Sequence, residues 1–75
     1  MNPIYVDFNN CDPQGRVRLN TVGTLDSLAR SGLKLTPGMK VPLRSEDLET
    51  EGLVEFSEGD HIWVATFLWN RLREG

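Results

Sequence analysis

The side chains with the clearest capacity for acid–base chemistry lie around a short glycine turn. His61 follows Asp60, and Glu58 stands two residues earlier. A histidine beside a carboxylate is the arrangement of a general base. Charged residues around Gly59 are, however, typical of a hairpin tip that faces water. The sequence has no nucleophile–base pair and no phosphate-binding loop, so we expect no catalytic residue and no enzymatic activity.

The single cysteine stands beside a carboxylate, in the pair Cys11-Asp12. A neighbouring negative charge disfavours the thiolate, so we expect a thiol that is less acidic and less reactive than a free one. One cysteine cannot form an internal disulfide. Together with the one histidine, it also supplies too few ligands for a usual zinc site.

Four carboxylates lie close together in an acidic run, namely Glu46, Asp47, Glu49 and Glu51. Carboxylates are the ligands that calcium prefers. The run lacks the alternating oxygen ligands and the central glycine of a calcium loop. We therefore expect no bound metal and no cofactor.

The strand predicted over residues 61–69 is apolar on both faces. One face carries Ile62, Val64, Thr66 and Leu68, and the other carries His61, Trp63, Ala65, Phe67 and Trp69. A sheet covered on one side only does not require this pattern. One interpretation is that the strand is central and buried on both faces. The other is that Trp63, Phe67 and Trp69 form a contact surface for a partner, and that Tyr5 contributes to this surface.

Five basic residues suggest an alternative ligand, single-stranded nucleic acid. Arg16 and Arg18 lie on the outward face of one predicted strand, alongside Tyr5 of the other strand of that hairpin. Three more basic residues complete a candidate strip: Lys34, Lys40 and Arg44. Small barrels often bind single strands with such a mixture of aromatic and basic groups. The net charge of −3 argues against a general nucleic-acid binder, which needs positive charge facing phosphate.

Charge is distributed unevenly along the chain. Residues 1–44 hold six basic and three acidic residues, whereas residues 45–60 hold seven acidic residues and no basic one. Two interpretations are open: a solvated surface whose halves attract each other in the fold, or a dipolar molecule that docks on an oppositely charged partner.

The elements that position these residues are mostly short strands. Ile4–Phe8 and Arg16–Asn20 alternate between apolar and polar residues, which predicts a hairpin with Phe8 opposite Val17 and Asp7 opposite Arg18. Thr24–Gly32 predicts a short helix with Thr24 as its cap and Gly32 at its end. Leu25, Leu28 and Leu33 should pack that helix on the sheet.

The second half of the chain predicts further strands. Met39–Arg44 alternates, and Pro42 places that strand at an edge or a bulge. Ser45–Gly52 is acidic and predicts a solvated loop. Residues 53–57 and 61–69 flank Glu58-Gly59-Asp60 and predict a hairpin.

The order of these elements predicts one mainly β domain over residues 1–75. We expect a small five-stranded SH3-like barrel, or a strongly bent antiparallel sheet, with one short helix; an OB-like barrel is the second choice. No stretch approaches the ~20 apolar residues of a membrane helix, and no signal peptide is visible, so a cytoplasmic protein is expected.

The segments Tyr5-Val6-Asp7-Phe8-Asn9-Asn10, Gly15–Thr21 and Gly23-Thr24 resemble a group of small uncharacterised bacterial proteins. The resemblance covers the first half of the chain and extends to Pro37-Gly38-Met39. It implies no activity and no site.

These observations favour a non-enzymatic binding domain. Its expected partner is another protein, or a second copy of itself, bound through Trp63, Phe67 and Trp69, with Tyr5 as an additional contact. Single-stranded nucleic-acid binding and a purely structural homo-oligomer are the alternatives.

Overall fold

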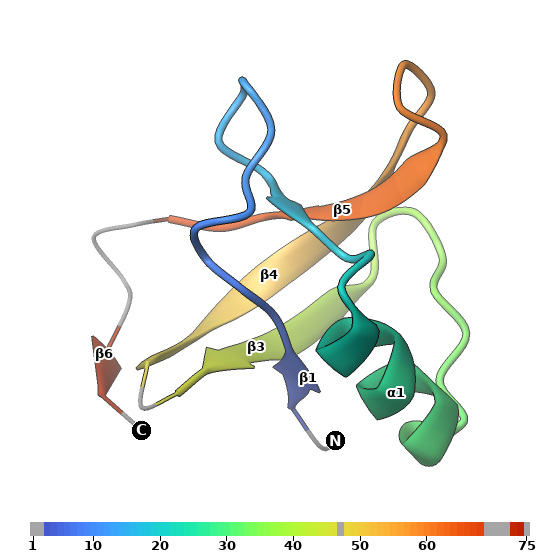
Figure 1. The fold of residues 1–75 in the computed structure, drawn as a ribbon. Helices are drawn as coiled ribbons and strands as arrows, with labels where there is room; N and C mark the ends of the chain where they lie inside the picture. Colours follow the sequence, from blue (N-terminus) through green and yellow to red (C-terminus); the bar gives the residue numbers. More distant parts are fainter. Residues whose placement is uncertain (1–2, 47, 69–72, 75) are drawn as a thin grey trace.

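The computed structural model describes residues 3–46, 48–68 and 73–74. The elements in chain order are β1 (Ile4–Tyr5), β2 (Val17–Arg18), α1 (Val22–Ser31), β3 (Lys40–Ser45), β4 (Leu48–Ser57), β5 (Ile62–Thr66) and β6 (Arg73–Glu74). Five strands form one strongly curled half-barrel sheet in the order β1-β3-β4-β5-β2, and β6 pairs with β4 (Figure 1). The predicted mainly β fold, with a strongly bent sheet and one short helix, is confirmed.

The hairpin of β4 and β5 is the centre of the sheet and was predicted correctly. Phe56 lies opposite Trp63, and Val54 lies opposite Ala65. Residues 58–61 connect the two strands, and His61 has a positive φ of 57° there. We call these four residues the hairpin tip. The β5 strand ends at Thr66, three residues before the predicted end.

The prediction of a solvated acidic loop over Ser45–Gly52 is wrong. The β4 strand begins at Leu48, and the ladder between β3 and β4 runs from Ser45 opposite Leu48 to Lys40 opposite Leu53. Within this stretch Glu49 and Glu51 alternate with the buried Thr50 and Gly52. This alternation is typical of a strand with one solvent-exposed face. The loop was predicted from the charge of the segment, although the two-residue alternation indicated a strand.

The pairing predicted for the first hairpin is also wrong. The β1 strand pairs in parallel with β3, where Ile4 lies opposite Leu43, and β2 pairs with β5, where Val17 lies opposite Ala65. Asp7 therefore does not face Arg18 across a ladder. The apolar alternation identified the buried face correctly, but alternation alone does not choose between strand partners.

The helix begins earlier than predicted, at Val22, with Thr21 as its cap. The Thr21 hydroxyl accepts a hydrogen bond of 3.2 Å from the backbone N–H of Thr24, which is itself a buried helical residue. Gly32 ends the helix with φ 67°, as predicted. Leu28 and Leu33 pack against the core, but Leu25 is 55% exposed and does not.

Both outer edges of the sheet are covered by the chain's own polar groups. On the β1 side, the Thr24 hydroxyl donates to the Tyr5 carbonyl at 2.6 Å, and the Ser27 hydroxyl accepts from the Tyr5 N–H at 3.3 Å. On the β2 side, the backbone N–H of Arg18 donates to the carbonyl of Asn10 at 2.9 Å. At these positions the backbone groups are therefore already paired and are not free to bind an added strand.

The β3 strand lies between β1 and β4, so the expected edge position of Pro42 is only partly met. Its β1 neighbour pairs with Leu43 and Arg44, and the register does not extend to Pro42. The Leu43 side chain of β3 lies against Gly52 of β4, where a Cβ would be 2.5 Å from Leu43 Cδ1.

The core fills the concave side of the sheet. Its buried residues are Ile4, Val6, Phe8, Val17, Leu19, Val41, Leu43, Val54, Ala65 and Phe67. Among the described residues, no helix is long and apolar enough to cross a membrane.

Candidate contact surface

The structure does not bring the four predicted contact residues together. Phe67 is 6% exposed, and its ring centroid lies 5.0 Å from that of Phe8, so its side chain belongs to the core. Tyr5 is half exposed on β1, which β3 and β4 separate from the β5 strand that carries Trp63. Trp69 lies outside the described residues. Of the four, Trp63 is the one that the structure leaves as a partly exposed aromatic residue near the hairpin tip.

Phe56 is the aromatic neighbour of Trp63, and the sequence argument missed it. The two side chains face each other across β4 and β5, with ring centroids 5.2 Å apart and planes at 76°, an edge-to-face contact. Phe56 is 40% exposed, and Trp63 is half-buried against the core. The predicted hairpin, with a three-residue connection over residues 58–60, would place Phe56 opposite Ile62. The connection in the structure has four residues, 58–61, and this places Phe56 opposite Trp63.

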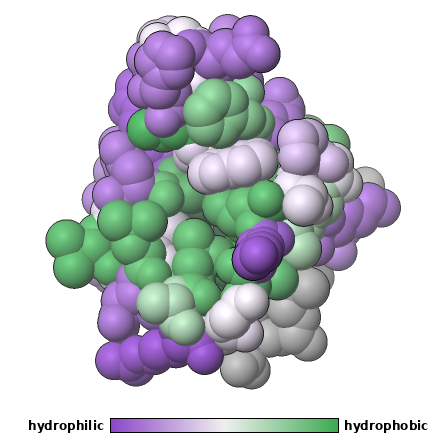
Figure 2. Space-filling view, turned by 90° about the vertical axis from the view of Figure 1, so that its right-hand side faces the viewer, coloured by the Kyte–Doolittle hydropathy of each residue, from purple (hydrophilic) through white to green (hydrophobic). Residues whose placement is uncertain are grey.

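Further half-buried apolar side chains come from α1 and from the segment that follows it. Four of them are half-buried and pack against the core, and together with the aromatic pair they make what we call the apolar face: Leu28, Leu33, Leu35, Met39, Phe56 and Trp63. Figure 2 shows hydrophobic residues gathered on the side of the molecule that carries α1 and residues 32–39, with hydrophilic residues above and below them and a strongly hydrophilic group among them. The face is therefore mainly, but not wholly, apolar.

The hairpin tip gives the upper end of the apolar face a negative charge. Glu58, Asp60 and His61 are exposed there, and neither acid forms an ion pair with any described residue. The tip projects from the top of the molecule, whereas α1 ends near the bottom of the same side (Figure 1).

The five basic residues of the candidate nucleic-acid strip are dispersed. Arg16 pairs with Asp12 at 2.7 Å and with Glu55 at 3.4 Å, Arg44 pairs with Glu49 at 3.1 Å, and Arg18 donates to the Cys11 carbonyl at 2.9 Å. Lys34 and Lys40 are exposed and have no ion pair among the described residues. Three of the five cations are thus already bound to the protein's own oxygen atoms.

Asp12 holds the first loop together. Its buried carboxylate accepts from the backbone N–H groups of Gln14 and Arg16, both at 2.9 Å, and from the Arg16 side chain. Burial alone would raise the pKa of this carboxyl, but the hydrogen bonds and the charge of Arg16 outweigh burial and lower the pKa. The polar contacts extend through Arg16 to Glu55, which accepts from the Thr66 hydroxyl at 2.6 Å.

Cys11 is partly buried and packs against the core. Its thiol donates to the Phe8 carbonyl at 3.2 Å, and burial, followed by the charge of Asp12, raises the pKa of the thiol above its usual value. The direction agrees with the weakly reactive thiol expected from the sequence.

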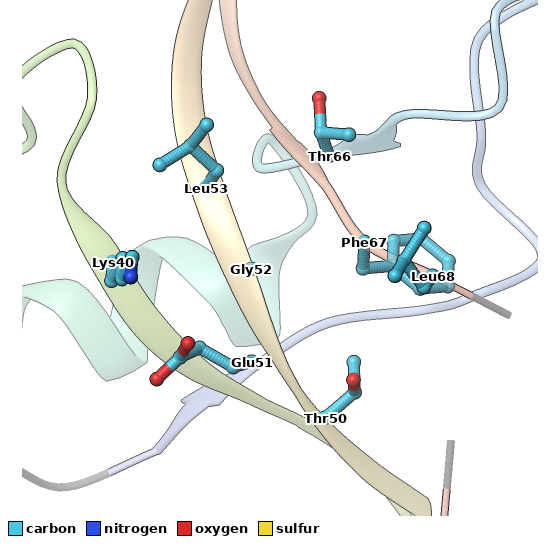
Figure 3. Close-up of a pocket in the computed structure, with 8 residues that line it drawn as sticks. All are labelled: Lys40, Thr50, Glu51, Gly52, Leu53, Thr66, Phe67 and Leu68. Atoms are coloured by element: carbon cyan, nitrogen blue, oxygen red, sulfur yellow. The ribbon is translucent and has the colours of Figure 1, made fainter. Parts of the chain in front are cut away.

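Two grooves lie away from the apolar face. One, of about 500 Å³, follows β4 past Gly52 and is lined by Lys40, Leu53, Thr66 and Leu68 among others (Figure 3). The other, of about 440 Å³, lies between β1 and α1 beside Tyr5 and Gly23. Within the part of the chain that the structure describes, no three potential metal ligands come together.

Comparisons of the chain with protein-family models, with curated proteins and with solved structures found no match.

Proposed function

We propose that this chain is a non-enzymatic binding domain whose apolar face binds a protein partner. The observation that carries the proposal is the exposure of Phe56. Phe56 is 40% exposed and makes an edge contact with a half-buried tryptophan, and four further half-buried apolar residues pack against the same core as that tryptophan. Aromatic residues of this kind are the usual anchors of protein interfaces, because they bury a large area with few rotatable bonds.

The covered sheet edges support binding through side chains. Strand addition needs a row of free backbone groups at an edge. The hydroxyls of Thr24 and Ser27 are hydrogen-bonded to the Tyr5 carbonyl and N–H. Beside β2, the backbone of Asn10 and Asp12 is hydrogen-bonded to that of Arg18 and Arg16. A partner that adds no strand must be held by contacts such as those of Phe56.

The charges favour a protein over single-stranded nucleic acid. Nucleic acid requires cations that are free to face phosphates. Arg16 and Arg44 face carboxylates instead, and the exposed acids Glu58 and Asp60 flank the aromatic pair. A phosphate backbone on this face would meet negative charge.

Two finer assignments belong to the same proposal. The curled sheet with its short helix is the form expected of an SH3-like barrel, and we assign the fold to that class. We also place the protein in the cytoplasm, where a single half-buried thiol such as that of Cys11 stays reduced.

The test compares Phe56 with a matched residue on the same strand. Leu53 is 39% exposed, but it lies three residues earlier on β4 and so points to the opposite face. Wild type, Phe56→Ala and Leu53→Ala are each immobilised and exposed to an extract of cells that make the protein, after circular dichroism has shown that all three are folded. We expect proteins that wild type and Leu53→Ala retain and Phe56→Ala loses. Equal retention by all three, including none, would overturn the proposal.

A further inference from the structure

We infer that the protein partner presents an arginine, next to an apolar residue, to Phe56 and the hairpin tip. The stem of the arginine lies along the Phe56 ring, and its guanidinium meets the carboxylates of the tip. The inference rests on the proposed function of Phe56 and deepens it, because it names the chemistry of the partner segment as basic and apolar.

The hairpin of β4 and β5 carries an unbalanced negative charge. Residues 53–66 contain three acids and no lysine or arginine. One of the acids, Glu55, accepts a hydrogen bond from Arg16. The other two, Glu58 and Asp60, are exposed, and neither forms an ion pair with a residue that the structure describes. The tip projects from the top of the molecule (Figure 1), so a cationic side chain of a partner can reach both carboxylates.

The exposed phenylalanine stands close to this charge. Phe56 is the last residue but one of β4, and Glu58 follows two residues later, at the start of the tip. Because Ser57 between them still belongs to the strand, the two residues lie on the same face, about 6.6 Å apart along the chain. One long side chain of a partner can therefore contact the ring and the carboxylate together.

Arginine is the side chain that fits this arrangement. Its three methylene groups can lie along an apolar surface while its charged head stays at the edge. The guanidinium is planar, stacks on aromatic rings and binds a carboxylate through two parallel hydrogen bonds. Phe56, which is 40% exposed in its edge contact with Trp63, offers such a ring beside Glu58. Lysine has the same charge but lacks the planar head.

The apolar neighbour of the arginine provides most of the affinity. Exposed charge pairs contribute little by themselves and are screened by salt. The partner must therefore also bury Phe56 and the exposed part of Trp63, which requires an apolar side chain. The acids then select among apolar partners, because an acidic segment would be repelled from the tip.

The test measures the binding of three dye-labelled octapeptides by fluorescence polarisation. Leucine alternates with arginine in the first peptide, with lysine in the second and with glutamate in the third. We expect the arginine peptide to bind wild type with an affinity that falls as salt is added, because exposed charges are screened. The lysine peptide should bind more weakly, and the glutamate peptide should not bind.

Glu58→Gln and Glu51→Gln are the matched pair of variants. Each removes one exposed acid, so an unspecific attraction of the basic peptide falls equally in both. Glu51 lies five residues before Phe56 on β4, on the opposite face, where it lines the groove beside Leu53 (Figure 3). We expect Glu58→Gln to bind the arginine peptide about two- to fivefold more weakly than Glu51→Gln does. Phe56→Ala should weaken it about tenfold or more.

Three results would overturn the inference. They are equal affinity of Glu58→Gln and Glu51→Gln for the arginine peptide, a lysine or glutamate peptide that binds wild type as tightly as the arginine peptide, and no binding of the arginine peptide at all.

The capture experiment separates this failure from that of the proposed function, with Glu58→Gln as a fourth bait. Proteins that Phe56→Ala loses and Glu58→Gln retains would leave the proposed function standing with a partner of different chemistry. Equal retention by wild type, Leu53→Ala and Phe56→Ala would overturn both.

Discussion

Asp12 is the residue on which the first loop depends. Its carboxylate accepts hydrogen bonds from two backbone N–H groups and from the guanidinium of Arg16, which also donates to Glu55 on β4. We predict that Asp12→Asn lowers the free energy of unfolding by about 1–3 kcal/mol, because the buried Arg16 pair is lost. Urea unfolding measures this change. Asp26→Asn, which breaks the exposed pair with Arg30, should cost less than about 1 kcal/mol.

The same carboxylate predicts how stability depends on pH. The pKa of Asp12 is lower in the folded chain than in the unfolded chain, so its contribution is fully present above the unfolded value. That contribution is lost as the pH falls through the lower, folded pKa. Wild type should therefore lose more stability than Asp12→Asn when the pH is lowered below about 4. Thermal unfolding of both proteins above and below this pH measures the loss. An equal loss of stability in wild type and Asp12→Asn would contradict this assignment.

Two glycines offer a paired test of packing. At Gly52 a Cβ would meet the buried Leu43 side chain at 2.5 Å and Ala65 Cβ at 3.2 Å. Gly52→Ala should therefore destabilise the fold by about 1–3 kcal/mol. At Gly23 nothing lies within 4 Å of the corresponding position, and α1 gains a better helix former, so Gly23→Ala should stabilise by about 0.4–1 kcal/mol. Denaturant unfolding of the two variants should give changes of opposite sign.

At the scale of elements, the contact between α1 and β1 depends on hydroxyl groups. The buried Thr24 hydroxyl donates to the Tyr5 carbonyl at 2.6 Å. Thr24→Val keeps the shape and removes the donor, so it should cost about 1–3 kcal/mol, whereas Thr24→Ser keeps the hydroxyl and should cost less. Hydrogen exchange at Val6, whose N–H donates to the Arg44 carbonyl, reports whether β1 loosens. Unchanged exchange in Thr24→Val would show that this hydroxyl does not hold the strand.

The sequence predicted the elements better than it predicted their partners. Alternation located the strands near Ile4, Val17, Val41 and Val54, and glycine located the end of the helix, because these signals are local. The parallel pairing of β1 with β3 joins Ile4 to Leu43 across most of the chain, and no local pattern encodes it. The cap was misplaced for a related reason: Thr21 and Thr24 are both good caps, and the contact of Thr24 with Tyr5 decides between them.

The candidate contact surface was predictable only in part. The two-sided apolar strand drew attention to Trp63, which is half-buried in the structure, but whether Phe67 is exposed depends on its contact with Phe8, far away in the chain. Phe56 was overlooked because it precedes the turn as one residue of an ordinary strand. Its exposure follows from the curl of the sheet, which leaves this end of the hairpin uncovered by α1 (Figure 1).

At the scale of the whole molecule, the fold separates a closed core from an open face. The core residues are almost fully buried, and the partly exposed pair of Phe56 and Trp63 lies next to a hairpin tip that carries two exposed acids, Glu58 and Asp60. Under the proposed function, Phe56 serves contact with a partner, whereas Phe67 belongs to the core.

The most direct measurement is the free energy of unfolding of Phe56→Ala and Phe67→Ala, obtained by urea titration at a concentration where the chain is monomeric. We expect a loss of about 3–5 kcal/mol for Phe67→Ala, which empties part of the core, and about 1–2 kcal/mol for Phe56→Ala, which loses an edge contact and partial burial. Equal losses would contradict the proposed binding role, because Phe56 would then be a core residue and the apolar face would have no anchor to offer a partner.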